Sequence, residues 1–482
     1  MGKQQFIPCR LDIDQFLADN PPDFPHHRDH FVRVLHFMYE IPSTLGKKRL
    51  KNGWVSVSVE ILRQWGIRHG GKILSHLIAH GVLRTDNLYI EDEKCRWYKF
   101  QPYYNSYPKI EYITKISLIK HMVNQTPLKR NKRTHPYLSK WLNPNLQLDA
   151  QAALIDCERK MQMDSVKRMR YGWKKFPKDP FQAYTSALIS INKIEQGDFF
   201  FTKDQTSGRF HSNLTNMGKI ARNHLTYSGH PLVSVDIKNS QPTFSTPLAS
   251  EKFFRPDISH SKNPMFSILD LPKSMRKEIE KVWIENRTGT GGVWKGHEVG
   301  AHTFTVVETP QLAVNEELEI YRSKVQDGIF YEYIFERAPK VLGYELDLTR
   351  DQLKVEVLKA MYSSNRYSTP VKQVFSHTFP YYNSIFRMLK KQEKSLLPRV
   401  LQAVEASIVL DRAAKRISIE EPKLFIATVH DSIVTLKGYE DYVAAIMQEE
   451  VQAAIGITPR LGIEFWSPDN IDRNEMRNWV PF

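Results

Sequence analysis

Two stretches of sequence decide the fold, HPLVSVDIKNSQP at residues 230–242 and LFIATVHDSIVTL at residues 424–436. In the first, an apolar strand delivers Asp236 at its end, where the chain turns into polar residues. In the second, a tight turn presents Asp431 between two apolar strands. A strand that ends in Asp beside a hairpin that carries Asp at its tip predicts two carboxylates close together in space.

Two carboxylates that lie so close repel each other unless a divalent cation sits between them. Two-metal phosphoryl transfer requires that arrangement, because one ion activates the attacking hydroxyl and the other holds the leaving pyrophosphate. Either Asp alone is weak evidence, since strand-end Asp residues commonly cap helices or turns. Together, Asp236 and Asp431 predict a site for two Mg²⁺ ions, with Mn²⁺ as a substitute.

The segment TRDQLKVEVLKAMY, residues 349–362, has the composition of a helix. Arg350, Lys354, Leu358 and Tyr362 recur every four residues, so they line one face. Two cations followed by an aliphatic and an aromatic side chain suit a nucleoside triphosphate, whose phosphates need neutralising and whose base and sugar need packing. Taken alone, the segment is better explained as an amphipathic surface helix.

In their order along the chain, these elements resemble the motifs of family A DNA polymerases and of single-subunit RNA polymerases of phage and mitochondrial type. Asp236 matches the motif A aspartate, the helix from Arg350 matches motif B, and His430 with Asp431 matches the motif C hairpin. The resemblance covers roughly residues 200–466. It implies an α+β right-hand polymerase fold with palm, fingers and thumb, in a divergent and compact member.

The resemblance also implies roles for further residues. GRFHS at residues 208–212 resembles the stretch that touches template and primer in the DNA enzymes, and the arginine before motif A and the long palm helix before motif C have counterparts too. The implied nucleotide-binding residues are Arg350, Lys354, Leu358, Tyr362 and Gln241. The implied primer- or template-binding residues are Gly208, Arg209, Ser212, Arg222, Gln402 and His430.

Three departures from the family pattern concern the sugar of the nucleotide, and a fourth concerns the fingers. Gln241 stands where the DNA enzymes usually have a Glu that excludes a ribose 2′-hydroxyl, and Ser432 follows Asp431 as in the RNA enzymes. Leu358 replaces an aromatic residue common in DNA enzymes. Ser363 follows Tyr362 in place of the usual Gly, which puts the pivot of the fingers in question. RNA synthesis on a DNA template is slightly favoured, and a family A type DNA polymerase stays open.

The N-terminal part, residues 1–110, shows a different pattern of predicted helices and strands. Residues 55–86 predict a short extended segment followed by two helices, and residues 87–104 predict a hairpin with its turn at residues 91–94. Helix, helix, hairpin is the order of a winged helix-turn-helix, so residues 1–110 are predicted as a winged-helix-like N-terminal domain. Small helical domains often show this order without binding DNA, so DNA binding by this part stays open.

Residues 111–200 carry most of the basic clusters, at residues 128–135 and 166–178, and the second cluster interleaves aromatic side chains with cations. A solvated helix face explains either cluster alone, whereas together they favour a path for nucleic acid. This region is predicted as a basic helical region, thumb-like or nucleic-acid binding. Residues 201–482 are predicted as the polymerase palm and fingers.

The composition favours a nucleic-acid partner and argues against a membrane protein. The 482 residues include 68 Lys and Arg against 53 Asp and Glu, a net charge of +15, and such an excess favours polyanions. The chain has no apolar run long enough to span a bilayer and no secretory signal. Its three cysteines match no zinc spacing and indicate reduced thiols. We expect a cytoplasmic protein of a bacterium or phage-infected cell, with an organelle left open.

Two hypotheses of other classes remain. A DNA-binding replication initiator or transcription factor could carry an inactive polymerase fold, although retention of both Asp residues and both helix cations argues against a dead site. A metal-dependent nuclease would need more clustered acids than Asp236 and Asp431 supply, and it leaves the helix of residues 349–362 unexplained.

Overall fold

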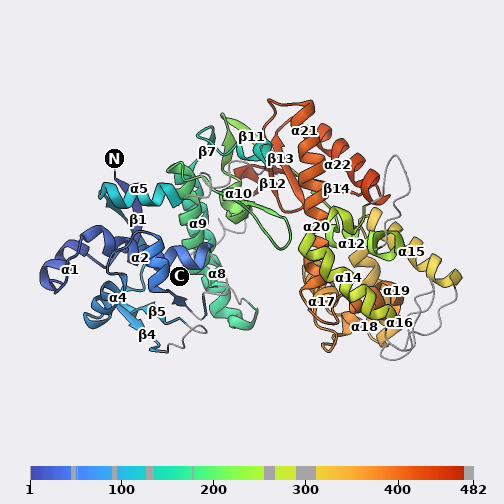
Figure 1. The fold of residues 1–482 in the computed structure, drawn as a ribbon, viewed down its shortest axis with the longest axis horizontal. Coiled ribbons are helices and arrows are strands. Elements are labelled where there is room, and N and C mark those ends of the chain that lie inside the picture. Colours follow the sequence, from blue (N-terminus) through green and yellow to red (C-terminus); the bar gives the residue numbers. More distant parts are fainter. Residues whose placement is uncertain are drawn as a thin grey trace. The chain divides into compact units, whose positions relative to one another are not determined.

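The computed structural model combines helices with short strands (Figure 1). It describes residues 2–44, 50–51, 53–88, 95–125, 135–175, 179–254, 266–288 and 311–471. The chain divides into two compact units. Unit 1 consists of residues 1–202, 212–231 and 466–482, and unit 2 consists of residues 203–211 and 232–465.

Unit 1 is built around one pair of strands and two long helices that pack against each other. Its main elements are β1 (Lys3–Pro8), α1 (Ile13–Asp19), α2 (Arg28–Thr44), β2 (Leu50–Lys51), β3 (Trp54–Ser56), α3 (Val59–Gln64), α4 (Gly70–Ala79), β4 (Leu83–Thr85), β5 (Trp97–Phe100), β6 (Pro108–Ile113), α5 (Ile116–Gln125), α7 (Pro136–Ser139), β7 (Leu146–Leu148), α8 (Ala150–Lys175), α9 (Pro180–Glu195), α10 (Asn213–Asn216), α11 (Lys219–Arg222) and β10 (Leu225–Tyr227). β1 pairs with β6, and α2 packs against α9. The first segment of unit 1 ends at residue 202, close to the predicted boundary at 200, and residues 1–110 and 111–200 belong to the same unit.

The extended segment and the two helices predicted within residues 55–86 are confirmed, whereas the first strand of the observed pair, β4, precedes the predicted hairpin of residues 87–104. β3 leads into α3, whose N-terminus is capped by the Ser58 hydroxyl, which accepts from the Ile61 N–H at 3.2 Å. After α4, strand β4 pairs antiparallel with β5, and the sheet order is β2-β3-β5-β4. The predicted turn at residues 91–94 and the basic residues 128–134 lie outside the described residues.

Unit 2 combines a small sheet with many helices. Its main elements are β11 (His230–Ile237), α12 (Ser240–Ser245), α13 (Glu251–Phe254), α14 (Lys273–Thr288), α15 (Gln311–Gln326), α16 (Phe330–Leu342), α17 (Arg350–Tyr362), α18 (Pro370–Thr378), α19 (Pro380–Leu389), α20 (Leu396–Ala406), a π-helix (Ser407–Ala414), α21 (Lys415–Glu420), β12 (Ile426–Val429), β13 (Ser432–Leu436), α22 (Glu440–Ile455) and β14 (Leu461–Trp466). β11 enters this unit from unit 1 at residue 232.

The sheet of unit 2 places β13 between β11 and β12, with β14 on the other side of β11. All pairs along β11-β13-β12 are antiparallel. Apolar residues of these strands are buried, and α22 and the π-helix pack against β13 (Figure 1). The predicted strand before Asp236 and the predicted hairpin around Asp431 are thereby confirmed.

The helices α15 to α19 enclose an aromatic core. The ring of Tyr321 stacks on that of Tyr382 with centroids 3.7 Å apart, and the Phe330 and Phe379 rings stack at 5.7 Å. This packing supports α17, the helix predicted at residues 349–362, from behind through α16 and α18. No helix in the described part of the chain has the length and apolar character that a bilayer span needs.

Candidate active site

The two predicted metal ligands meet at one end of the sheet in unit 2. The register of β11 and β13 places Asp236 directly opposite Ser432. Asp431 precedes Ser432 at the tip of the turn between β12 and β13. His430 closes this turn with φ +57°, the left-handed region that His adopts more readily than most residues. The local sequence thus brings the two carboxylates into electrostatic contact.

The surroundings of Asp236 oppose its negative charge. Burial raises the pKa of Asp236 well above its usual range, and the Asp431 carboxylate raises it further. Lys238 and Lys354 act in the opposite direction and lower this pKa, while Glu464 on β14 raises it. Because like charges this close disfavour ionisation, a cation between the two carboxylates would stabilise the ionised form.

The donor set fits a hard divalent cation. The described residues contain no group of three or more potential His, Cys, Asp or Glu ligands, so the protein offers a pair of carboxylates. Proteins usually hold Mg²⁺ through one or two carboxylates, and the remaining positions are filled by water and substrate phosphates. Asp236 and Asp431 match that mode of binding.

Helix α17 presents the predicted cationic face to solvent. The Thr349 hydroxyl and the Gln352 side chain form a capping box at its N-terminus. Leu353, Val357, Ala360 and Met361 form its buried face, whereas Arg350 and Lys354 are exposed and Leu358 and Tyr362 are half-buried. The four predicted residues therefore lie off the packed face.

Arg350 already has a partner in the absence of a ligand. Its Nε donates to the Glu332 carboxylate at 2.6 Å, and the arginine side chain is 68% exposed. An exposed ion pair of this kind contributes only about 0–1 kcal/mol. The Arg350 guanidinium can therefore exchange Glu332 for another anion at little cost.

A hydrogen-bonded chain connects four polar side chains of unit 2. The Tyr362 hydroxyl donates to Gln241 Oε1, and Gln241 Nε2 donates to Glu405 Oε2 at 2.6 Å. Arg209 donates to both oxygens of Glu405, with Nε to Oε1 at 2.9 Å and Nη2 to Oε2 at 2.7 Å. Three predicted site residues, Arg209, Gln241 and Tyr362, are thus held together by one glutamate.

Glu405 stands near Gln402 in the segment that resembles the palm helix before motif C, but the sequence assigned it no role. It is fully buried on α20, and burial raises its pKa to about 7, against the opposing effect of Arg209. The predicted residue Gln402 lies nearly one turn earlier on α20 and is half-buried. The signal that could have identified Glu405 is a charged residue inside the apolar run LQAVEASIVL, because buried acids usually need a partner.

Two buried lysines donate to backbone carbonyls at the C-terminal end of α17 and in the residues that follow it, which the sequence did not indicate. Lys390 Nζ donates to the carbonyl oxygens of Met361 at 2.5 Å and of Ser363 at 3.0 Å. Lys372 Nζ donates to the Ser364 and Tyr367 carbonyls, both at 2.7 Å. Cations at a helix C-terminus complement its dipole and its unpaired carbonyls. Ser363, predicted as a doubtful pivot, thus ends a firmly held helix.

The predicted primer- and template-binding residues are divided between the units. Gly208 has φ +73°, which favours glycine, and it precedes Arg209 in unit 2. Ser212 and Arg222 belong to unit 1, where Ser212 caps α10 and the Arg222 guanidinium lies 5.3 Å from the Trp466 ring centroid.

His430 and one unpredicted histidine lie beside the aspartate pair. The His430 ring lies 6.4 Å from that of His211 in an edge contact, and both residues belong to unit 2. Burial raises the pKa of Tyr331 on α16, and the charges of Asp431 and Asp236 raise it further, so Tyr331 also lies near the aspartate pair. Tyr331 carries no sequence signal that marks it as part of the site, whereas His211 lies within the GRFHS stretch, from which it was not selected.

No protein-family model matches the chain, and no curated protein matches it. One similar solved structure is the polymerase domain of Pol1 from M. smegmatis in complex with a DNA primer-template and dNTP. The identity is 12%, the match covers 73% of each chain, and the TM-score is 0.28. A TM-score this low does not establish a shared fold.

Proposed function

We propose that this chain is a template-directed nucleotidyl polymerase that acts on a DNA template by two-metal-ion phosphoryl transfer. The observation that carries the proposal is the pairing of Asp236 with Asp431 at neighbouring strand ends, within electrostatic reach of Lys354 on α17. Paired carboxylates beside an exposed cationic helix are what a metal-bound triphosphate requires.

Asp236 and Asp431 would hold the Mg²⁺ ions. When bound, these ions supply activation of the attacking hydroxyl and stabilisation of the leaving pyrophosphate. Lys354 and Arg350 would neutralise the triphosphate, Arg350 by releasing Glu332. His430 would lie near the growing strand end.

Leu358 and Tyr362 would contact the base and sugar of the incoming nucleotide. Tyr362 is positioned for this through Gln241 and Glu405, which Arg209 holds in turn. The oxygen and the nitrogen of the Gln241 amide both already form hydrogen bonds. Gln241 would therefore influence the choice of sugar through the place where its side chain is held. Gly208, Ser212, Arg222 and Gln402 remain proposed contacts to primer or template.

RNA synthesis is slightly favoured, because Ser432 after Asp431 and Leu358 on α17 follow the RNA enzymes. A family A type DNA polymerase is the alternative, and the GRFHS stretch at residues 208–212 and Gln241 keep it open.

The runner-up of another class is a DNA-binding replication initiator or transcription factor. Residues 54–100 favour it, because β3, α3, α4 and the β4–β5 pair have the order and pairing of a winged helix. In the leading proposal the same part would hold template DNA, with the basic helix α8 as a further contact. Tyr171 and Trp173 on α8 are exposed there.

An extension assay in Mg²⁺ separates these functions. Primed and unprimed DNA templates would be supplied with ribonucleotides or deoxyribonucleotides separately, beside the Asp431→Ala variant. Strand growth with one sugar that is lost in the variant supports the polymerase and identifies its substrate. Strand shortening would point to a nuclease, and tight DNA binding without extension would favour the DNA-binding factor.

A further inference from the structure

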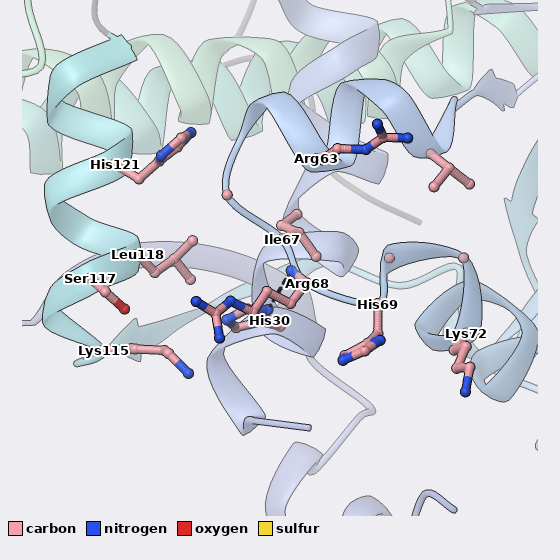
Figure 2. A pocket seen from close by; sticks show the side chains of 14 residues that line it. His30, Arg63, Ile67, Arg68, His69, Lys72, Lys115, Ser117, Leu118 and His121 are labelled. Carbon is pink, nitrogen blue, oxygen red and sulfur yellow. Dashed lines mark hydrogen bonds between the residues drawn. The ribbon is translucent and has the colours of Figure 1, made fainter. Parts of the chain in front are cut away.

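Unit 1 contains a basic pocket of about 700 Å³ that takes no part in the proposed metal-ion chemistry. It lies between α2, the turn from α3 to α4, and the first turns of α5 (Figure 2). Four cationic side chains line it and no acidic residue does; they are Arg63, Arg68, Lys72 and Lys115. We find no ion pair for these four cations among the described residues, so their charge is directed to a ligand or to solvent.

The N-terminus of α4 opens into this pocket. His69 precedes the helix with φ +56° and gives it no side-chain cap, and Gly70, Gly71 and Lys72 form its first turn along the pocket wall. The N–H groups of a helix's first turn have no partner within the helix and attract anions. Glycine at position 70 is required because a Cβ there would lie 2.7 Å from the Leu62 side chain.

A buried histidine supplies an independent sign of a ligand. His30 is only 4% exposed, and its Nδ1 accepts a hydrogen bond from the Arg68 backbone N–H at 3.0 Å. Burial lowers its pKa to about 4, so the neutral ring carries its proton on Nε2. Nε2 is buried and has no hydrogen-bond partner. Figure 2 places His30 centrally in the pocket, between Lys115 and His69.

The two walls of the pocket are fixed to each other. His121 Nε2 on α5 contacts the Gln64 carbonyl oxygen at 2.6 Å, across the pocket from α4. A Cβ at position 66 would lie 2.9 Å from the same imidazole, so Gly66 permits this close packing. The backbone walls and the His30 donor are therefore held in place before a ligand arrives, which reduces the ordering cost of binding.

We propose that this pocket binds the terminal phosphate of a nucleotide or of a nucleic-acid strand. A terminal phosphate carries close to two negative charges at neutral pH and accepts several hydrogen bonds, which suits four cations, free helix N–H groups and a neutral imidazole donor. The pocket is larger than a phosphate, which leaves room for the attached nucleoside. The site lies in unit 1 and does not depend on the polymerase proposal.

Binding to the full-length protein, in buffer without divalent metal, tests the proposal. The probes are a single-stranded oligonucleotide with a 5′-phosphate, the same strand with a 5′-hydroxyl, and adenosine monophosphate beside adenosine. His30→Asn keeps an acceptor for the Arg68 N–H and removes the Nε2 donor, and Lys115→Ala removes a cation from the pocket. Lys120→Ala is the matched control, because it removes an exposed cation from the same helix outside the pocket.

For a strand end, we expect wild type to bind the 5′-phosphate strand about tenfold more tightly than the 5′-hydroxyl strand. For a nucleotide, adenosine monophosphate binds and adenosine does not. Either preference is lost in His30→Asn and Lys115→Ala and kept in Lys120→Ala. The absence of both preferences in wild type, or their survival in Lys115→Ala with its intact fold, overturns the proposal. Both results are independent of strand extension.

Discussion

Gln241 has both ends of its amide occupied, one by Tyr362 and the other by Glu405. The bond to Tyr362 fixes Gln241, on α12 after β11, relative to the end of α17. Because an engaged amide is less available to a ligand, the sugar preference of the proposed polymerase should depend on how firmly Tyr362 holds Gln241.

Tyr362→Phe tests this dependence. The variant keeps the aromatic ring but frees Gln241 Oε1, which can then accept a hydrogen bond from a ribose 2′-hydroxyl. We expect the ratio of kcat/KM for ribonucleotides over deoxyribonucleotides to rise by about fivefold, the effect of one net hydrogen bond. Tyr344→Phe, at an exposed residue, serves as the control and should leave the ratio unchanged. A ratio equal to wild type in Tyr362→Phe would contradict this role of Gln241.

Glu405→Ala tests the buried charge that joins Arg209 to Gln241. Removing the glutamate leaves the mostly buried Arg209 guanidinium without its bidentate partner, which typically costs about 3–5 kcal/mol. We expect the free energy of unfolding in urea to fall by that amount. Glu319→Ala, an exposed position on α15, should change it little. Equal stability of the two variants would show that Glu405 is not the structural centre of the network.

At the level of whole elements, the N-terminus of helix α19 is bound by a buried carboxylate. Glu317 on α15 accepts hydrogen bonds from the Tyr381 N–H at 3.0 Å and the Tyr382 N–H at 3.1 Å. These N–H groups belong to the first turn of α19, which has no partner for them within the helix. Burial nevertheless dominates and raises the pKa of Glu317 from 4.5 to about 7.

A pH dependence of stability follows from Glu317. Between pH 4.5 and about 7 the folded state binds this proton more strongly than the unfolded state, so stability falls as pH rises through that window. The loss attributable to Glu317 is about 3 kcal/mol. Glu317→Gln cannot ionise and should lack this loss, which urea unfolding at several pH values would measure. Parallel stability curves for wild type and variant would contradict the assignment.

The elements that carry the site were predictable because their signals are local. The apolar strand before Asp236, the turn at Asp431 and the four-residue spacing on α17 each lie within about a dozen residues. Glu405 was not predicted as a site residue, because its partner Arg209 lies 196 positions away and no local pattern connects them.

Lysines at 372 and 390 were missed for a different reason. Lysine is rarely buried, so neither residue suggests a contact with the end of α17 until the helices α18 and α19 are packed.

The division of the chain into units also depended on long-range pairing, since β1 and β6 are about a hundred residues apart.

The charge of the whole molecule, +15, predicts how it meets nucleic acid. Lysine and arginine contacts to phosphates release counterions, so affinity for DNA should fall linearly with salt on logarithmic axes. For six such contacts the loss between 50 and 200 mM salt is roughly a thousandfold. Titration of a labelled duplex at several salt concentrations measures the slope, and an affinity that does not change with salt would contradict binding through phosphates.

The central claim is that Asp236 and Asp431 together form the catalytic metal site of a polymerase. Its most direct test is the single-turnover rate of strand extension in Mg²⁺ for wild type, Asp236→Asn, Asp431→Asn and the exposed control Asp441→Asn. We predict that both site variants lose several orders of magnitude in rate while keeping their fold and DNA affinity, and that the control extends like wild type. Extension at the wild-type rate by either site variant would contradict the account.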